Sequence, residues 1–299
     1  MKSTKQYKRS VFILTKTNLF IFFLFSFFFL NSYLLIKKVS AQSAISLSVS
    51  PPILELMIQP GKTVKQTYTI SNDGNNTNLI PKIVYFTPAD SIGNIDLTDS
   101  KAPDWISFDQ KTSQLTISPP ENAEEIDHFL TLIFETKEPV DLLNQNSTSL
   151  VSQIGSNILL TISKDGNPKK SAEIVEFSAP RLVDSFYPIS YSLTLANNGN
   201  SFWKPNGKIV TNKETLKLAP QNIISGSSRK IFCIDNENLI NCNLQSRFHL
   251  GKIESKLEFL LDNDPKIYKA ETVTYSFPFI LILAFIILGI IFKLWRRKK

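Results

Sequence analysis

The chain has 299 residues and a formal net charge of +7. That charge is unevenly placed, because residues 1–41 carry seven Lys or Arg, residues 277–299 carry five, and neither segment contains an acidic residue. The segment between them holds the other 21 basic residues against all 26 acidic ones, so its net charge is −5. A mildly acidic body excludes nucleic acid as an expected partner and makes the basic ends a signal of membrane topology.

The C-terminal segment is typical of a membrane-spanning helix. Residues 272–292 carry no charge, and at about 1.5 Å per residue they make a helix of roughly 30 Å, the thickness of a hydrocarbon core. Residues 293–299 form a basic tail that contains Lys293, Arg296, Arg297, Lys298 and Lys299. Positive charge beside a spanning helix stays in the cytoplasm, so we expect a single-pass type I protein of the plasma membrane with most of the chain outside.

The N-terminal segment is typical of an export signal. Basic residues precede an uncharged, Phe-rich run from Thr17 to Ile36, and Val39-Ser40-Ala41 has the small-x-small pattern of a signal-peptidase site. We therefore predict a signal peptide over residues 1–41. The alternative is an uncleaved anchor, since the apolar run is long and two lysines follow it. Both alternatives place residues 42–271 outside.

Between these ends the sequence is typical of an all-β protein. Apolar and polar residues alternate from Val64 to Ile70 and from Ile189 to Leu195, with the period of two expected of half-buried strands. A polar, turn-rich segment, Lys164–Lys170, divides the exterior part. We predict two domains of ordinary size, residues 42–168 and 169–271.

Each of these lengths holds several short strands, which predicts two tandem Ig-like antiparallel β-sandwiches. The signal segment precedes them, and the transmembrane helix follows. Two long segments, Thr87–Asp104 and Lys137–Val151, interrupt the strand pattern, and we expect both to be irregular.

Turn motifs in both predicted domains support a family resemblance. They are Ser50-Pro51-Pro52, Gln59-Pro60-Gly61-Lys62-Thr63, Trp105-Ile106 and Leu115-Thr116-Ile117-Ser118-Pro119 in the first, and Asn198-Gly199-Asn200 with Pro205-Asn206-Gly207-Lys208-Ile209 in the second. With this layout the chain resembles the WxL-interacting-protein type of bacterial cell-surface protein. The resemblance implies a first domain that faces peptidoglycan and a second domain that faces a protein.

Residues that usually carry catalysis or bind metals are sparse. The sequence has no G-x-S-x-G elbow, P-loop or Rossmann glycine motif. Its two cysteines lack a C-x-x-C or H-x-x-x-H partner, so zinc has no ligand set. Of the two histidines, His128 and His249, the first shares its strand parity with Leu130 and Leu132, which favours a structural imidazole. We expect a protein that is not an enzyme and holds neither metal nor cofactor.

Two segments contain candidate binding residues. Asp90, Asp96 and Asp99 crowd one loop, where they could hold Ca²⁺ or form a solvated acidic surface, and their spacing fits no defined calcium motif. Phe202 and Trp203 follow an Asn-Gly-Asn turn. They could present an aromatic contact for a carbohydrate or protein, or they could fill the open end of the sandwich core.

The two cysteines are expected to form a structural disulfide. Cys233 and Cys242 both lie in the exterior part, where oxidising conditions favour a bond. The bond would close a polar loop, Ile234–Asn241, at its base and would contribute roughly 2–3 kcal/mol. Its expected role is local bracing.

These observations favour a non-enzymatic surface protein, anchored by one C-terminal span, that presents two β-sandwich domains for cell-envelope association or protein binding. The expected partner is a cell-wall polymer or a surface protein. The alternative is an accessory subunit that docks to another membrane or secreted complex. The helix contains Ala284 and Gly289 but no G-x-x-x-G pair, so it lacks one common signature of helix association.

Overall fold

We describe the protein from a computed structural model, which defines residues 47–72, 79–136, 153–245, 248–262 and 264–297. All of them belong to one compact unit, Ser46–Lys299. The predicted signal segment and the predicted irregular segment Lys137–Val151 lie outside the described residues, as do Lys298 and Lys299.

The first sandwich packs two layers of strands. One layer is a five-stranded sheet in the order β2 (Ile53–Ile58), β10 (Gln153–Ile162), β9 (Asp127–Thr136), β5 (Leu79–Pro88) and β6 (Ile95–Lys101). The other layer is formed by β3 (Val64–Thr67), β8 (Gln114–Ile117) and β7 (Ile106–Asp109), with β1 (Leu47–Ser50) paired to β4 (Thr69–Asn72).

The core of this sandwich follows from the period of two along its central strands. Alternation puts Leu130, Leu132 and Phe134 of β9 on the inner face of the sheet. Ile158 and Leu160 of β10 share that face, and all five side chains are at most 1% exposed. Burial of each contributes roughly 1.5–3 kcal/mol, so this apolar face holds the two layers together.

The second sandwich has a larger principal sheet. Its order is β12 (Leu182–Asp184), β22 (Tyr268–Phe277), β21 (Gly251–Leu260), β15 (Asn206–Thr211), β16 (Thr215–Leu218), β18 (Cys233–Asp235) and β19 (Asn238–Ile240). The opposing layer contains β11 (Ala172–Ser178), β14 (Ser192–Asn197) and β17 (Ser228–Lys230), with β13 (Ile189–Ser190) paired to β20 (Asn243–Leu244). A separate apolar cluster fills the space between them, so each sandwich has its own core.

The strand order confirms the predicted all-β, Ig-like architecture. In the first sandwich, β3 and β4 belong to one segment, so the minor layer follows the A-B-E-D order, and β10, β9 and β5 follow the G-F-C order of an immunoglobulin domain. Two pairs depart from the antiparallel expectation. The early strands β2 and β12 pair in parallel with the last strands of their sandwiches, β10 and β22.

The sequence suggested that the segment Thr87–Asp104 is irregular, but part of it forms a strand. Residues Ile95–Lys101 form β6, the edge strand that pairs with β5 across a register shift. Most side chains of β6 are exposed, so it lacks the buried, alternating apolar face that identifies a strand in sequence.

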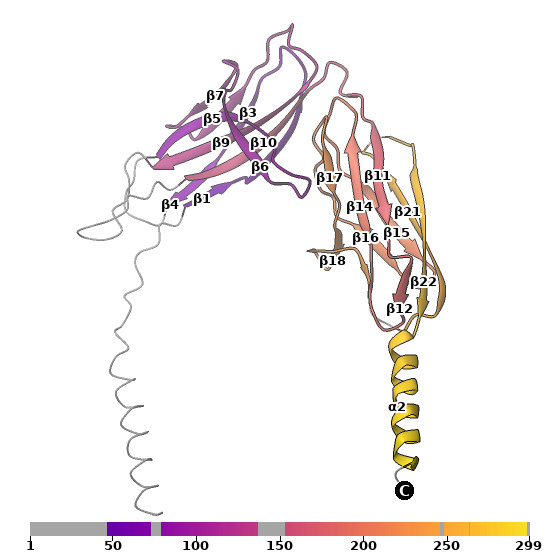
Figure 1. Ribbon diagram of the computed structural model, residues 1–299. Helices are drawn as coiled ribbons and strands as arrows, with labels where there is room; N and C mark the ends of the chain where they lie inside the picture. The colour runs from indigo at the N-terminus through magenta and orange to yellow at the C-terminus, as the bar shows by residue number, and fades with distance from the viewer. Residues whose placement is uncertain (1–46, 73–78, 137–152, 246–247, 263, 298–299) are drawn as a thin grey trace, which may run out of the picture. The chain divides into compact units, whose positions relative to one another are not determined.

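A single described helix, α2 (Phe279–Arg297), follows the second sandwich, and it is long and apolar enough to cross a membrane. The sequence suggested that the helix begins at Thr272, but in the structure it begins at Phe279. Thr272 and Ser276 instead pair with Ser255 and Gly251 of β21, and Pro278 then separates strand from helix. Figure 1 shows α2 following directly on β22. Lys293 lies in the C-terminal part of α2, and the last turn contains Arg296 and Arg297.

Candidate functional site

The two sandwiches contact each other through the outer face of the five-stranded sheet and the segments 201–204 and 222–230. Lys230 donates its backbone N–H to the carbonyl of Ser91, at 2.7 Å. The hydroxyls of Thr161 and Ser201 lie 3.2 Å apart. Both loop regions that the sequence marked as candidate binding segments therefore lie at this junction.

Asp127 is the most strongly perturbed acid at the junction. Its carboxylate accepts a hydrogen bond from the Thr161 hydroxyl at 2.7 Å and from the backbone N–H of Phe202 at 2.6 Å. Burial raises the pKa of Asp127 to about 6, although both hydrogen bonds and the charge of Lys170 lower it. A carboxyl group of the first sandwich thus holds the Phe202 segment of the second.

Glu55 makes a second polar connection. Its two carboxylate oxygens accept hydrogen bonds from the ammonium group of Lys204 and from the side-chain amide of Asn222, each at 2.7 Å. Burial by itself would raise the pKa of Glu55, but these two hydrogen bonds and the charge of Lys204 together lower it. The ionised form of Glu55 is therefore the one that the junction stabilises.

Asp90 organises the turn between β5 and β6. One carboxylate oxygen accepts the backbone N–H groups of Ile92, Gly93 and Asn94, at 2.9, 3.0 and 3.1 Å. Slight burial works against ionisation, but hydrogen bonds from Asn94 and from the two other backbone groups lower the pKa of Asp90. This carboxylate is committed to its own turn, a common role of Asp in loops.

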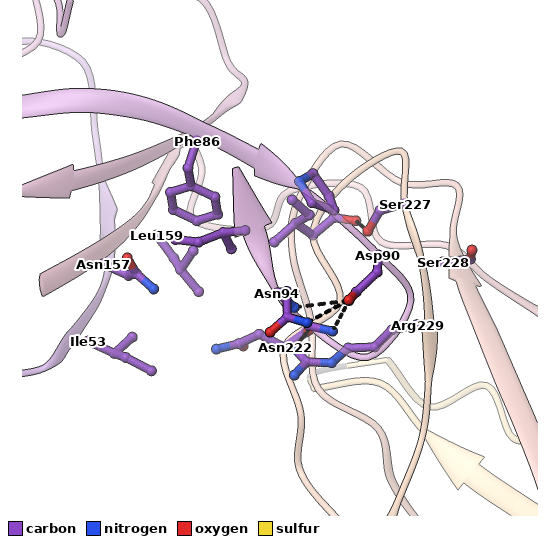
Figure 2. A pocket seen from close by; sticks show the side chains of 14 residues that line it. Ile53, Phe86, Asp90, Asn94, Asn157, Leu159, Asn222, Ser227, Ser228 and Arg229 are labelled. Atoms are coloured by element: carbon purple, nitrogen blue, oxygen red, sulfur yellow. Dashed lines mark hydrogen bonds between the residues drawn. The ribbon is translucent and has the colours of Figure 1, made fainter. Parts of the chain in front are cut away.

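A cavity of about 160 Å³ lies beside this turn, with walls from both sandwiches (Figure 2). The first sandwich lines it with residues of β2, β5, β6, β10 and the Asp90 turn, and the second with residues from Asn222 to Arg229. Its apolar walls consist of Ile53, Phe86, Pro88, Ile95, Leu159 and Ile224. The polar lining includes Asn157, Asn222, Ser227, Ser228 and Arg229.

Two buried polar atoms at this cavity have no hydrogen-bond partner among the described residues: the Arg229 Nε and the Asn222 side-chain oxygen. The other nitrogens of Arg229 are engaged, since Nη1 donates to the carbonyl of Asn222 at 2.6 Å and Nη2 to that of Ile92 at 3.5 Å. Burial lowers the pKa of Arg229, while the charge of Asp90 raises it. The cavity therefore combines apolar walls with one spare donor and one spare acceptor, which is the complement of an amide group.

The remaining predicted binding residues take different positions. Trp203 is 1% exposed and stacks on Phe259 with ring centroids 6.3 Å apart, so its side chain belongs to the core rather than to a binding surface. Phe202 is partly exposed at the junction. Asp96 and Asp99 lie on β6 with exposed side chains. The described part of the chain contains no group of three or more His, Cys, Asp or Glu side chains that could hold a metal ion.

His128 has a structural environment. Its Nδ1 lies 2.8 Å from the hydroxyl of Tyr85, and its ring makes an edge contact with Trp105 at a centroid distance of 5.2 Å. Burial lowers its pKa, against a raising effect of Glu124. The neutral imidazole thus packs within the first sandwich.

The structure contains the disulfide bond between Cys233 and Cys242. The segment it closes is a two-stranded hairpin, β18–β19, rather than an irregular loop. Asn236 and Glu237 form the tip with positive φ angles of 45° and 68°, as two-residue hairpin turns of the common primed type require. Both cysteines are almost fully buried, so the bond joins the hairpin to the core of the second sandwich.

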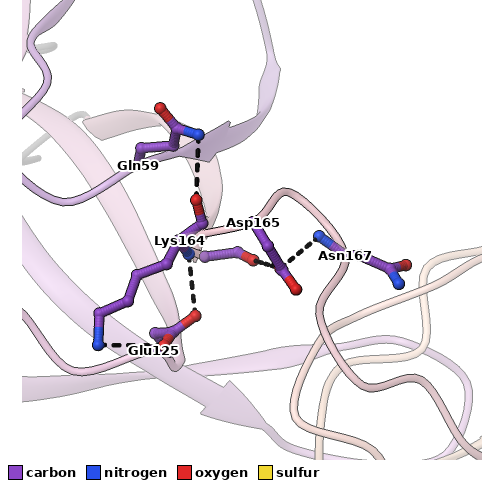
Figure 3. A network of polar contacts seen from close by, with 6 residues as sticks. Gln59, Glu125, Lys164, Asp165 and Asn167 are labelled. Atoms are coloured by element: carbon purple, nitrogen blue, oxygen red, sulfur yellow. Dashed lines mark hydrogen bonds and ion pairs between the residues drawn. The ribbon is translucent and has the colours of Figure 1, made fainter.

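The segment between the sandwiches is tied back to the first one (Figure 3). Glu125 accepts the backbone N–H of Lys164 at 2.9 Å and pairs with its ammonium group at 3.3 Å. Asp165 accepts the hydroxyl of Ser163 and the backbone N–H of Asn167, at 3.1 and 2.8 Å. Its pKa is lowered first by the hydrogen bond from Asn167 and then by that from Ser163. The predicted boundary is thus a hydrogen-bonded turn.

No protein-family model matches the chain, and no curated protein matches it. Among solved structures, it is similar to extracellular domains 3–5 of Drosophila OTK (12% identity, 77% of this chain, 61% of that chain, TM-score 0.24). It is also similar to the class 5 fimbriae chaperone CfaA (13% identity, 76% of this chain, 99% of that chain, TM-score 0.33). A third similar structure is that of the two tandem V-type regions of VCBP3, a v-region-containing chitin binding protein (9% identity, 78% of this chain, 100% of that chain, TM-score 0.29).

Proposed function

We propose that the protein is a non-enzymatic surface protein, held in the plasma membrane by α2, that presents two β-sandwich domains to a component of the cell envelope. The observation that carries this proposal is the helix. All its side chains are solvent-exposed and no described residue of α2 is buried, although nearly all are apolar. Such a surface is stable only in an apolar surrounding, and a bilayer of matching thickness provides one.

The orientation follows from charge. Arg296 and Arg297 occupy the last turn of α2 and Lys293 lies one turn before them, while no basic residue lies in its first turns. Under the positive-inside rule the C-terminal end stays in the cytoplasm, and both sandwiches lie outside. The net charge of −5 on residues 42–276 agrees with a domain pair that need not bind nucleic acid.

The junction cavity is the site that we assign to the envelope partner. Its spare donor, the Arg229 Nε–H, and spare acceptor, the Asn222 oxygen, belong to two residues that line the cavity together with its apolar walls. An amide group satisfies both, and amides occur in the N-acetyl groups of cell-wall polymers and in peptides. Hydrogen bonds from a bound amide to both atoms would pair two buried groups that otherwise have no partner. Each pairing is worth roughly 1–3 kcal/mol.

The test compares two neutral substitutions on neighbouring residues. Arg229→Met removes the cavity donor, whereas Lys230→Met removes the same charge from a side chain that lies over Phe232 at 5.8 Å and does not line the cavity. The full chain, purified in detergent, is sedimented with insoluble cell wall and in parallel captured on envelope proteins. Binding should fall about tenfold for Arg229→Met and stay near wild type for Lys230→Met.

Equal losses in the two variants would contradict the cavity assignment, because charge alone would then explain binding. If the wild-type chain bound neither cell wall nor envelope protein, the proposed function would be wrong. Loss of binding to only one of the two materials identifies which partner carries the amide.

A further inference from the structure

The connection between the second sandwich and α2 is short and hydrogen-bonded. Only Pro278 separates the end of β22 from the start of the helix, and its carbonyl already accepts the first helical hydrogen bond, from Ile282 at 3.1 Å. Asp184, which is 7% exposed, accepts the backbone N–H of Ile280 at 2.9 Å with one carboxylate oxygen and that of Phe186 at 3.0 Å with the other. A carboxylate at a helix N-terminus satisfies a free donor and the helix dipole together. The sandwich therefore holds the helix through a cap as well as through the chain.

Around this cap lies a group of exposed apolar side chains that we call the collar: Phe186, Tyr187, Phe248, Leu250 and Phe277. Each is between 47% and 60% exposed. They come from three separate segments, namely the turn after β12, the segment before β21 and the end of β22. Single exposed apolar residues are ordinary, but a contiguous group from three segments indicates a contact surface.

Backbone hydrogen bonds place all three segments at one level. Ser185 donates to the carbonyl of Phe277 at 3.2 Å, and His249 donates to the carbonyl of Ser185 at 3.0 Å. The rings of Phe186 and Phe248 meet edge to face at 5.3 Å between centroids, and those of Phe277 and Phe279 lie 5.6 Å apart. The collar is thus continuous with the first residue of α2.

We infer that the collar is a lipid-contacting surface, which seats the end of the second sandwich in the interfacial layer of the bilayer. The inference rests on the proposed function of α2 as the membrane anchor. If α2 spans the membrane, its apolar run begins at Phe279, so a side chain on Phe277 lies at the depth of the first helical turn. Amphipathic rings such as that of Tyr187 are enriched at that depth, and Phe and Leu side chains are buried there at the boundary between headgroups and acyl chains.

The position of the collar beside the anchor helix favours lipid over other occupants. A partner protein or a second copy would have to cover the collar at the same level as the lipid headgroups that surround the helix. Lipid is present on all sides of an anchored helix and needs no further binding event. Because Asp184 accepts a hydrogen bond from the first turn of α2, the end of the sandwich that carries the collar is the end joined to the helix.

The test measures depth with a nitroxide label on the full chain in phosphatidylcholine vesicles. Phe186→Cys places the label in the collar, and Phe248→Cys is an independent second position. Ile267→Cys is the matched control, because Ile267 is 54% exposed and precedes the opposite end of β22, about 30 Å from the helix. The native cysteines are joined in the disulfide and do not take the label.

Power saturation should give a severalfold higher ratio of oxygen to polar nickel-complex collisions at residues 186 and 248 than at 267. A label at Leu283→Cys, within α2, reports on the anchor itself. If that label is buried in lipid while the collar labels resemble the one at 267, the collar inference is wrong and the anchor stands. If the label at 283 is also open to the nickel complex, the proposed anchor is wrong. Collar labels that are shielded from both reagents would indicate protein contact and would overturn the inference.

Discussion

Asp127 allows a quantitative test of the junction between the sandwiches. Its pKa is raised from 3.8 to about 6 by burial, so the folded state binds a proton between these values that the unfolded chain releases. At roughly 1.4 kcal/mol for each pH unit, the protonated form contributes about 3 kcal/mol. This contribution is fully present below pH 3.8 and is lost as the pH rises through about 6.

Asp127→Asn provides the neutral reference. The amide oxygen can still accept the N–H of Phe202, and the amide nitrogen can donate to the hydroxyl of Thr161, so the contacts of the neutral acid are kept. We expect the free energy of unfolding of the full chain, measured by urea titration in detergent, to fall by about 2–3 kcal/mol relative to this variant between pH 4 and pH 7.

Asp165 is a control with the opposite sign. Hydrogen bonds from Asn167 and Ser163 lower its pKa, so its contribution is present above the unfolded value and is lost as the pH falls. Relative to Asp165→Asn, the wild-type chain should therefore become more stable as the pH rises. If the wild type and Asp127→Asn differed by the same amount at every pH, or if the difference followed the direction of Asp165, our account of the buried carboxyl would be refuted.

Other substitutions test the second sandwich and the anchor. Trp203→Ala should destabilise the second sandwich by about 3–5 kcal/mol, because the side chain is 1% exposed and leaves a cavity, and urea unfolding with unchanged stability would exclude a core position. Replacing Cys233 and Cys242 by Ser should cost roughly 2–3 kcal/mol in the same domain, and the wild-type chain should take up a thiol label only after reduction. Neutral residues in place of the five terminal basic residues should weaken the orientation bias, so protease added to spheroplasts should leave part of the exterior protected.

Much of the fold could be predicted from local patterns. The alternation from Ile189 to Leu195 predicted a half-buried strand, and the structure places β13 and β14 there with Ile189, Leu193 and Leu195 fully buried. β6 was missed, since an exposed edge strand with many polar residues has no buried face to create a period. The start of α2 was placed too early, because an uncharged stretch such as Thr272–Phe277 fits a buried strand as well as a spanning helix.

The site was only partly predictable. Crowded acidic residues marked the Asp90 segment as a candidate binding loop, and aromatic residues marked the Phe202 segment. Nothing in the sequence shows that both belong to one junction, since the contact joins residues far apart in the chain. Arg229 and Asn222 carry no motif, and they become notable only through burial and missing partners. Asp127 was missed for the same reason, because a carboxyl at the start of a strand gives no sequence signal of its desolvation.

The parallel pairing of β12 with β22 has a consequence for synthesis. The first sandwich has all its strands once the chain reaches Ile162, whereas the second lacks a central strand until Phe277 has been made. Since α2 follows after a single residue, the second sandwich can close only when the helix is already leaving the ribosome. A chain truncated before β22 would therefore expose the edges of β12 and β21 to other chains. A chain truncated after Phe277 would keep the second sandwich closed.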